Sequence, residues 1–268
     1  MRVQLIAGNW KMNMTGPQAC ALVQGIAERV DQRPDVDVVV CPPFTAIERV
    51  KDELRDSHIK VGAQNMFWLE AGAYTGQISP KMLVDLRVDY VIVGHSETRG
   101  RFGVPSEDLK PVLGYFSETD ETVNRKVKAA LFHSIQPILC VGETSDERQA
   151  GKTDDVVRSQ LTGGLRGVEP DELYGLVIAY EPVWAIGTGQ TCDDEEANRV
   201  CGTIRQLLAD MAGAEPADNI RVLYGGSVKA SNAKGLLHQP EIDGALVGGA
   251  SLDAHEFVEI IYGAQREA

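Results

Sequence analysis

The sequence has no long apolar run and comparatively few positive charges. No apolar stretch approaches the roughly 20 residues of a membrane-spanning helix. The start, "MRVQLIAGNWKMN", has too few apolar residues in a row for a signal peptide. Lys and Arg number 26 against 39 Asp and Glu, a formal net charge of −13. Because no basic cluster stands out, we expect neither a nucleic-acid nor a membrane partner.

Cysteine is scarce, and its spacing gives no sign of a metal. The five cysteines form no C-x-x-C and no ligand-like spacing with histidine. An odd number of cysteines without a secretion signal indicates reduced thiols in a cytoplasm. A dinucleotide-binding G-x-G-x-x-G after the first apolar run is also missing. The sequence therefore predicts a cytoplasmic protein that works without a metal or a cofactor.

Short β-branched runs recur along the chain, each followed by a stretch of helical periodicity. They are "VQLIAG", "VDVVVC", "IKVGAQ", "DYVIVG", "QPILCVG", "LVIAY", "IRVLYGG" and "DGALVGG". These runs lack a clean apolar–polar alternation, which is typical of parallel strands buried on both faces. The pattern predicts an α/β fold, a single (β/α)₈ barrel domain over residues 1–268. An open doubly wound sheet is the alternative, but it more often has fewer strands and the missing glycine motif.

One connection is longer than the others. About forty residues separate "VIVG" from "QPILCVG", which is long for one helix and its loops. "DETVNRKVKAALF" supplies the expected helix and leaves "GRFGVPSEDLKPVLG", residues 100–114, as surplus. Pro105 and Pro111 argue against a long helix there. We predict that residues 100–114 are an insertion on the surface of the barrel.

Polar residues and glycines follow several of the expected strands, where barrel enzymes place their catalytic groups. They are Asn9 and Lys11 after the first run, His95, Ser96 and Glu97 after the fourth, Glu181 after the sixth, Ser227 after the seventh, and Gly248 and Gly249 after the eighth. Taken alone, Lys11 reads as a solvated charge, Asn9 as a turn residue and the glycines as tight turns. Glu181 fits such a reading least, because a carboxylate that ends a buried strand must be used or paired.

Together these groups suit one kind of chemistry. A carboxylate beside the apolar "PVW" that follows Glu181 should become a stronger base when the site closes and loses water. A neutral His95 and the Lys11 ammonium can polarise a carbonyl or stabilise an enediolate oxygen. Paired glycines let backbone N–H groups approach a phosphate. The set predicts proton abstraction next to the carbonyl of a small phosphorylated sugar.

Six motifs follow one another along the chain: "AGNWKMN", "VGHSETR", "PILCVGET", "AYEPVWAIGTG", "LYGGSV" and "GALVGGASL". Together and in this order they closely resemble the triosephosphate isomerase family. The match runs from residue 3 to about residue 262, and segment 100–114 is its main interruption. The resemblance implies interconversion of dihydroxyacetone phosphate and D-glyceraldehyde 3-phosphate through an enediolate, a step of glycolysis and gluconeogenesis.

The resemblance also implies a role for each residue at the strand ends. Glu181 matches the base that carries the proton, and His95 matches the neutral electrophile. Lys11 matches the cation that attracts the phosphate, Asn9 its hydrogen-bonding neighbour, and Glu97 the carboxylate that holds the lysine. The phosphate grip is formed by the remaining matched positions: Gly187, Ser227, Gly248 and Gly249. The stretch "PVWAIGTG" matches the family's mobile lid.

A homodimer is implied as well. The segment "AQNMFWLEAGAYTGQIS" is similar to the family's loop that enters the partner subunit, where Thr75 would meet the partner's active site. Thr98 replaces an arginine of the family and Gln77 a glutamate, and we expect both changes to weaken the interface rather than the chemistry. Segment 100–114 has no counterpart in the family pattern, and we expect it to extend the dimer contact or add another.

Two other functions remain open from the sequence. One is a catalytically inactive barrel that binds phosphate, and the other is a different barrel enzyme acting on a sugar phosphate, since barrels share phosphate-binding loops. Both fit the combination of Glu181, His95 and Lys11 less well than an active isomerase does.

Overall fold

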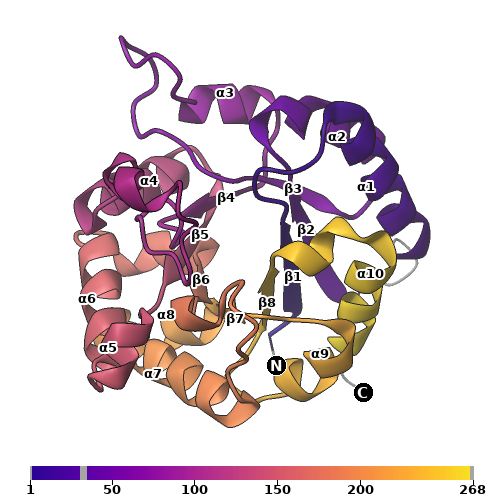
Figure 1. Cartoon of the computed structure of the whole chain (residues 1–268). Helices are drawn as coiled ribbons and strands as arrows, with labels where there is room; N and C mark the ends of the chain where they lie inside the picture. The colour runs from indigo at the N-terminus through magenta and orange to yellow at the C-terminus, as the bar shows by residue number, and fades with distance from the viewer. Residues whose placement is uncertain (1, 31–34, 266–268) are drawn as a thin grey trace.

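The structure, a computed structural model, describes residues 2–30 and 35–265, so residues 1, 31–34 and 266–268 of the expected domain lie outside it. Parallel strands form a closed barrel in chain order, with β8 returning to pair with β1 (Figure 1). The strands are β1 (Gln4–Asn9), β2 (Val36–Cys41), β3 (Lys60–Ala63), β4 (Tyr90–Val93), β5 (Gln136–Val141), β6 (Val177–Tyr180), β7 (Arg221–Tyr224) and β8 (Gly244–Val247). Each lies within one of the predicted runs or extends it by one residue, and the (β/α)₈ fold is confirmed.

Helices surround the barrel on its outside (Figure 1). They are α1 (Gly16–Val30), α2 (Ile47–Glu53), α3 (Pro80–Asp85), α4 (Asp120–Phe132), α5 (Ser145–Gln149), α6 (Thr153–Gly164), α7 (Asp194–Ala212), α8 (Ala214–Asn219), α9 (Ala230–Leu237) and α10 (Ala254–Gly263). In α1 an apolar stripe that includes Leu22 and Ile26, four residues apart, is buried. None of the helices in the described ranges is long and apolar enough to cross a membrane.

The core consists of two layers, which explains why the strands do not alternate in polarity. Inside the barrel a small cluster includes Leu5, Cys41 and Cys140. A larger cluster fills the space between strands and helices and includes Ile6, the neighbour of Leu5. Because successive residues of a strand point to opposite faces, a strand buried on both faces must be apolar throughout.

The surplus segment connects β4 to α4. Residues 100–114 form turns and part of a 3₁₀ helix, η2 (Lys110–Tyr115), and this fully described segment contains no α-helix. Val104, Val112 and Tyr115 are exposed. The absence of a long helix agrees with the effect expected of its two prolines.

Candidate active site

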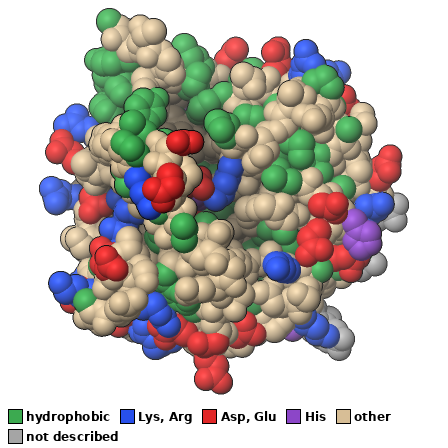
Figure 2. Space-filling view, viewed as in Figure 1, with side chains coloured by type: hydrophobic (Ala, Val, Ile, Leu, Met, Phe, Trp, Pro, Cys, Tyr) green, Lys and Arg blue, Asp and Glu red, His purple; other side chains and the backbone are tan. Residues whose placement is uncertain are grey.

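A cavity of about 440 Å³ opens at the carboxyl ends of the strands. Its lining includes every site residue predicted from the sequence except Thr75: Asn9, Lys11, His95, Ser96, Glu97, Glu181, Gly187, Ser227, Gly248 and Gly249. Figure 2 shows a hollow at the barrel mouth with acidic and basic side chains at its edge. The closed barrel brings these residues together, because its parallel strands all end at this rim.

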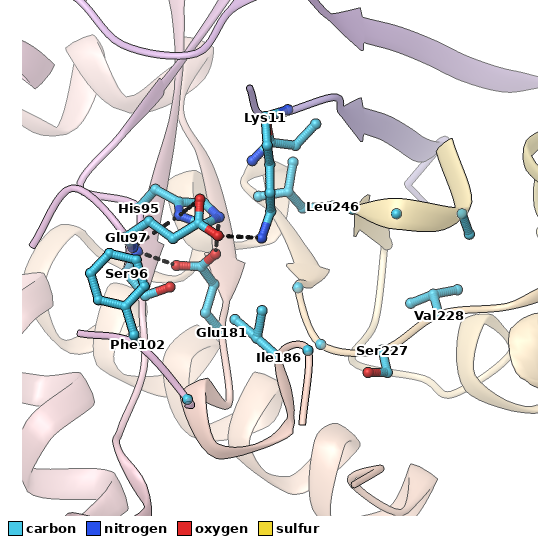
Figure 3. Close-up of a pocket in the computed structure, with 18 of the residues that line it drawn as sticks. Lys11, His95, Ser96, Glu97, Phe102, Glu181, Ile186, Ser227, Val228 and Leu246 are labelled. Carbon is cyan, nitrogen blue, oxygen red and sulfur yellow. Dashed lines mark hydrogen bonds and ion pairs between the residues drawn. The ribbon is translucent and has the colours of Figure 1, made fainter. Parts of the chain in front are cut away.

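Glu181 is the most deeply buried carboxylate of the predicted set, with 2% of its surface exposed. Its Oε1 lies 2.8 Å from Nε2 of His95, and its Oε2 accepts a hydrogen bond of 2.9 Å from the backbone N–H of Ser96 (Figure 3). Burial raises the pKa of Glu181, but His95, Ser96 and Lys11 outweigh it, and the net pKa lies below the ordinary value. The stronger base expected from the sequence therefore requires the carboxylate to leave these donors.

His95 is buried, with 6% of its surface exposed, and its ring is held by a backbone contact. Its Nδ1 accepts a hydrogen bond of 3.1 Å from the backbone N–H of Glu97. A ring nitrogen that accepts carries no proton, so the proton of a neutral imidazole lies on Nε2, which faces Glu181. Gly94, with φ of 70°, makes the turn that leads from β4 to this histidine. The geometry favours the neutral, hydrogen-bond-donating form predicted for His95.

Lys11 is placed by a strained backbone and by two side chains. Its φ of 51° lies in the left-handed region, which is uncommon for a residue with a side chain. Asn9 Oδ1 accepts from the Lys11 backbone N–H at 3.0 Å, and the Nζ atom of Lys11 lies 2.6 Å from Glu97 Oε1. Asn9 thus contacts the backbone of Lys11, and Glu97 contacts its ammonium. They point the ammonium across the cavity beside Glu181 (Figure 3).

Gln64 is a positioning residue that the sequence reasoning missed. Its Nε2 donates to the backbone oxygen of Lys11 at 2.8 Å and to that of Cys41 at 2.9 Å. It thereby ties the strained turn after β1 to the end of β2. The only signal in the sequence was its place at the end of the run "IKVGAQ", where a polar residue meets the barrel mouth.

The predicted phosphate grip lies on the opposite side of the cavity from His95. Ser227 Oγ donates to the backbone oxygen of Ala185 in the lid at 2.8 Å. A side chain at Gly249 would meet no atom within 4 Å, and one at Gly248 would meet only Lys11 at 3.6 Å, so this edge is open to a ligand. Gly225 differs, because a Cβ there would lie 3.0 Å from Glu181 Cγ. Its missing side chain makes room for Glu181.

A second buried carboxylate, Glu143, holds the start of the lid, which we define as residues 182–189. Its Oε1 accepts from Trp184 Nε1 at 2.8 Å and from the hydroxyl of Tyr180 at 3.2 Å. The guanidinium of Arg148 lies 4.3 Å from the centre of the Trp184 ring. Burial raises the pKa of Glu143 above its ordinary value. This residue was missed as a functional candidate, although it belongs to the motif "PILCVGET".

Thr75 and Thr98, which the sequence connected with the subunit interface, do not line the active-site cavity. Thr75 is exposed on the segment between β3 and α3, which projects from the barrel (Figure 1), and it does not line the cavity of its own chain. Thr98 donates to Glu118 Oε2 at 2.6 Å, and the other oxygen of Glu118 pairs with Lys126. The threonine that replaces the family's arginine thus takes part in a network within the chain.

The first residues of segment 100–114 extend into the active site. Phe102, Gly103 and Val104 line the active-site cavity together with Glu181 and the lid residue Ile186. The sequence placed this segment on the surface, with a role in subunit contact, and gave it no part in the site. Its first residues nevertheless form one wall of the site.

A closed (β/α)₈ barrel with a carboxylate, an imidazole and an ammonium at its carboxyl end defines a barrel enzyme of acid–base chemistry. The family model described as triosephosphate isomerase matches residues 4–264, and the chain belongs to that family. It is 49% identical over 261 residues to a triosephosphate isomerase of Alkaliphilus oremlandii (strain OhILAs), covering 97% of this chain and 99% of that protein. It is also 49% identical over 263 residues to one of Carboxydothermus hydrogenoformans, covering 98% and 99%. The resemblance seen in the sequence is confirmed.

Proposed function

We propose that the chain interconverts dihydroxyacetone phosphate and D-glyceraldehyde 3-phosphate with Glu181 as the base and His95 and Lys11 as the groups that stabilise the enediolate. The observation that carries this proposal is the meeting of these three side chains, from three separate strand ends, in one cavity. Membership of the triosephosphate isomerase family supports the choice of reaction. The reaction is a step of glycolysis and gluconeogenesis.

The geometry of the site supports the following route for the proton. Glu181 leaves the N–H of Ser96, takes a proton from the substrate carbon next to the carbonyl and returns it to the neighbouring carbon. The Nε2–H of His95 donates a hydrogen bond, and then its proton, to the substrate oxygen on which negative charge develops, and Nε2 takes back the hydroxyl proton of the neighbouring oxygen, so that the second proton passes between the two substrate oxygens. Lys11 stabilises the same charge from the other side of the cavity. The base ends the cycle ionised, so no external proton donor or acceptor is consumed.

The phosphate is held at the opposite edge of the cavity by backbone N–H groups. We assign this role to Gly187, Ser227, Gly248 and Gly249, all of which line the cavity. A chain with a net charge of −13 must create positive potential locally for an anionic substrate. Backbone N–H groups and Lys11 supply it here.

We propose further that the protein is a homodimer formed through the segment between β3 and α3. This segment exposes Leu69 and Tyr74 and is braced internally, because the rings of Phe67 and Trp68 stack 4.0 Å apart. Figure 2 shows hydrophobic side chains gathered over it. An exposed apolar surface of this kind is typical of a protein interface. Five free thiols favour the cytoplasm as the compartment of this dimer.

The assay that tests the function couples each direction of the reaction to a dehydrogenase and compares triose phosphates with four- and five-carbon sugar phosphates. An active isomerase converts both trioses, with inorganic phosphate as a competitive inhibitor. Binding of phosphate without turnover would favour the inactive barrel instead. Turnover of only the longer sugar phosphates would favour another barrel enzyme.

A further inference from the structure

The insertion, residues 100–114, touches the lid through one glycine. A Cβ built on Gly103 would lie 2.7 Å from Thr188 Cγ2, 2.7 Å from the backbone oxygen of Val183 and 2.8 Å from that of Ile186. Carbon atoms do not approach oxygen or carbon so closely, so the backbone at Gly103 lies directly against the lid. The φ of Gly103 is not in the left-handed region, and the glycine is therefore required by this contact and not by its backbone conformation.

The insertion is fixed to the barrel on the other side of that contact. The guanidinium of Arg101 pairs with Glu147 and donates to the backbone oxygen of Gly142 at 3.1 Å. The ring of Phe102 meets that of Phe116 edge-on, with the ring centres 5.4 Å apart. The part-buried ion pair of Arg101 and the ring contact of Phe102 therefore hold the chain directly before Gly103 against the barrel.

The lid is held from its other side by the phosphate grip and by its own contacts. Ser227 Oγ donates to the oxygen of Ala185, and Thr188 Oγ1 donates to the oxygen of Trp184 at 2.7 Å. Gly187 lies between these contacts and lines the cavity. In Figure 3, Phe102 stands on the Ser96 side of Glu181, and the lid residue Ile186 stands on the other side. The insertion and the lid thus close two sides of one site.

We propose that the insertion is a fixed seat for the lid, and that Gly103 is the positioning residue through which it sets where the lid grips the substrate phosphate. This rests on the proposed function, in which Gly187 of the lid binds that phosphate. A seated lid has less conformational freedom to lose when phosphate binds, so the seat strengthens phosphate binding. Gly103 acts through the lid and touches no reacting atom.

Gly103→Ala tests this with a matched control in the same segment. The added methyl must push the lid away, whereas Gly114→Ala places its methyl where no atom lies within 4 Å, again without a left-handed φ. We expect Gly103→Ala to raise KM and to weaken the binding of inorganic phosphate about three- to tenfold, with a smaller effect on kcat. Gly114→Ala should leave all three values unchanged.

Thr188→Ser shows whether Gly103→Ala weakens phosphate binding by displacing the lid or by damaging the fold. Serine keeps the hydroxyl that bonds Trp184 but lacks the Cγ2 methyl, which lies 2.7 Å from the added Cβ, as near as the backbone oxygen of Val183. Combined with Gly103→Ala it should restore part of the phosphate affinity, which a general loss of folding would not allow. Calorimetry with inorganic phosphate reports on the seat even if the wild-type chain proves inactive, so failure of the proposed function is seen separately. Phosphate affinity that is unchanged or tighter in Gly103→Ala, or equal effects of the two alanines, would overturn the proposal.

Discussion

The Oε1 atom of Glu181 lies 2.8 Å from Nε2 of His95, and both side chains are almost fully buried. Burial raises the pKa of Glu181, yet His95 and the Ser96 N–H lower it to below its ordinary value of about 4.5. In this arrangement the carboxylate is ionised but weak as a base. The contact therefore keeps the carboxylate ionised before substrate binds. When the substrate replaces Glu181 as the hydrogen-bond partner of His95, the pKa of Glu181 rises and the carboxylate becomes a stronger base.

The first prediction concerns pH. His95→Asn removes the imidazole that lowers the pKa of Glu181 and leaves the burial that raises it, so the pKa should rise in this variant. NMR titration of the ¹³C-labelled glutamate carboxyls measures it directly. His133→Asn, which alters a histidine beside Glu70 on the outside of the barrel, is the control and should leave the Glu181 titration unchanged. An unaltered pKa in His95→Asn would contradict the account.

The same shift predicts how stability depends on acid. A carboxyl whose pKa is lower in the folded than in the unfolded chain stabilises the fold above its unfolded pKa. That stabilisation is lost as the pH falls through the folded value. The wild type should therefore lose more stability than His95→Asn does as the pH falls from 6 through about 4.5 and below, as measured by urea unfolding. Equal losses in the two proteins would argue against the lowered pKa.

Much of the site follows from the sequence, because a barrel brings all strand ends to one rim. Glu181, His95 and Lys11 could be placed together from the ends of apolar runs alone. Gln64 and Glu143 could not, since each acts by bonding a backbone or a ring that is distant in sequence. The approach of Gly103 to the lid was also beyond sequence reasoning, because contacts between two loops depend on tertiary packing and not on any periodic pattern.

The second prediction concerns Gln64. Gln64→Ala removes both hydrogen bonds that hold the backbone at Lys11 and Cys41, and the left-handed turn at Lys11 loses its support. We expect a loss of about 1–3 kcal/mol in unfolding free energy, and a fall in kcat/KM of about tenfold or more as the ammonium is misplaced. Chemical denaturation and steady-state kinetics measure the two effects.

Gln24→Ala serves as the matched control. Gln24 is exposed and bonds only the side chain of Glu53 among the contacts seen in the described residues, so both measured values should stay close to wild type. A Gln64 variant with normal kcat/KM would show that the turn at Lys11 holds its shape without this support.

The third prediction concerns Glu143. Glu143→Ala leaves Trp184 Nε1 and the hydroxyl of Tyr180 without the carboxylate that accepts from them inside the protein. Each unsatisfied group costs about 1–3 kcal/mol, so the melting temperature should fall clearly. Glu143→Gln keeps an acceptor oxygen for Trp184 and should fall less. Because Trp184 lies near the start of the lid, both variants should also raise KM. Equal melting temperatures of wild type and Glu143→Ala would exclude this role.

The fourth prediction concerns the proposed dimer. Tyr74→Asp places a charge on the exposed apolar segment between β3 and α3 and should shift sedimentation from dimer to monomer. Activity should fall in parallel, because Thr75 on this segment is proposed to meet the partner's active site. Tyr174→Asp, at a similarly exposed tyrosine near α8, should change neither mass nor activity. A monomeric Tyr74→Asp chain with full activity would refute the role given to this segment.

The central claim is that Glu181 carries the proton between the two substrate carbons, and one measurement tests it most directly. The coupled assay on D-glyceraldehyde 3-phosphate is run on the wild type, Glu181→Asp and Glu181→Gln. Aspartate keeps the charge, but its shorter side chain places the carboxylate further from the substrate carbon, so kcat should fall about 10²-fold. Glutamine cannot accept the proton and should cost about 10⁴-fold or more. Turnover in Glu181→Gln equal to that of the wild type would contradict the account.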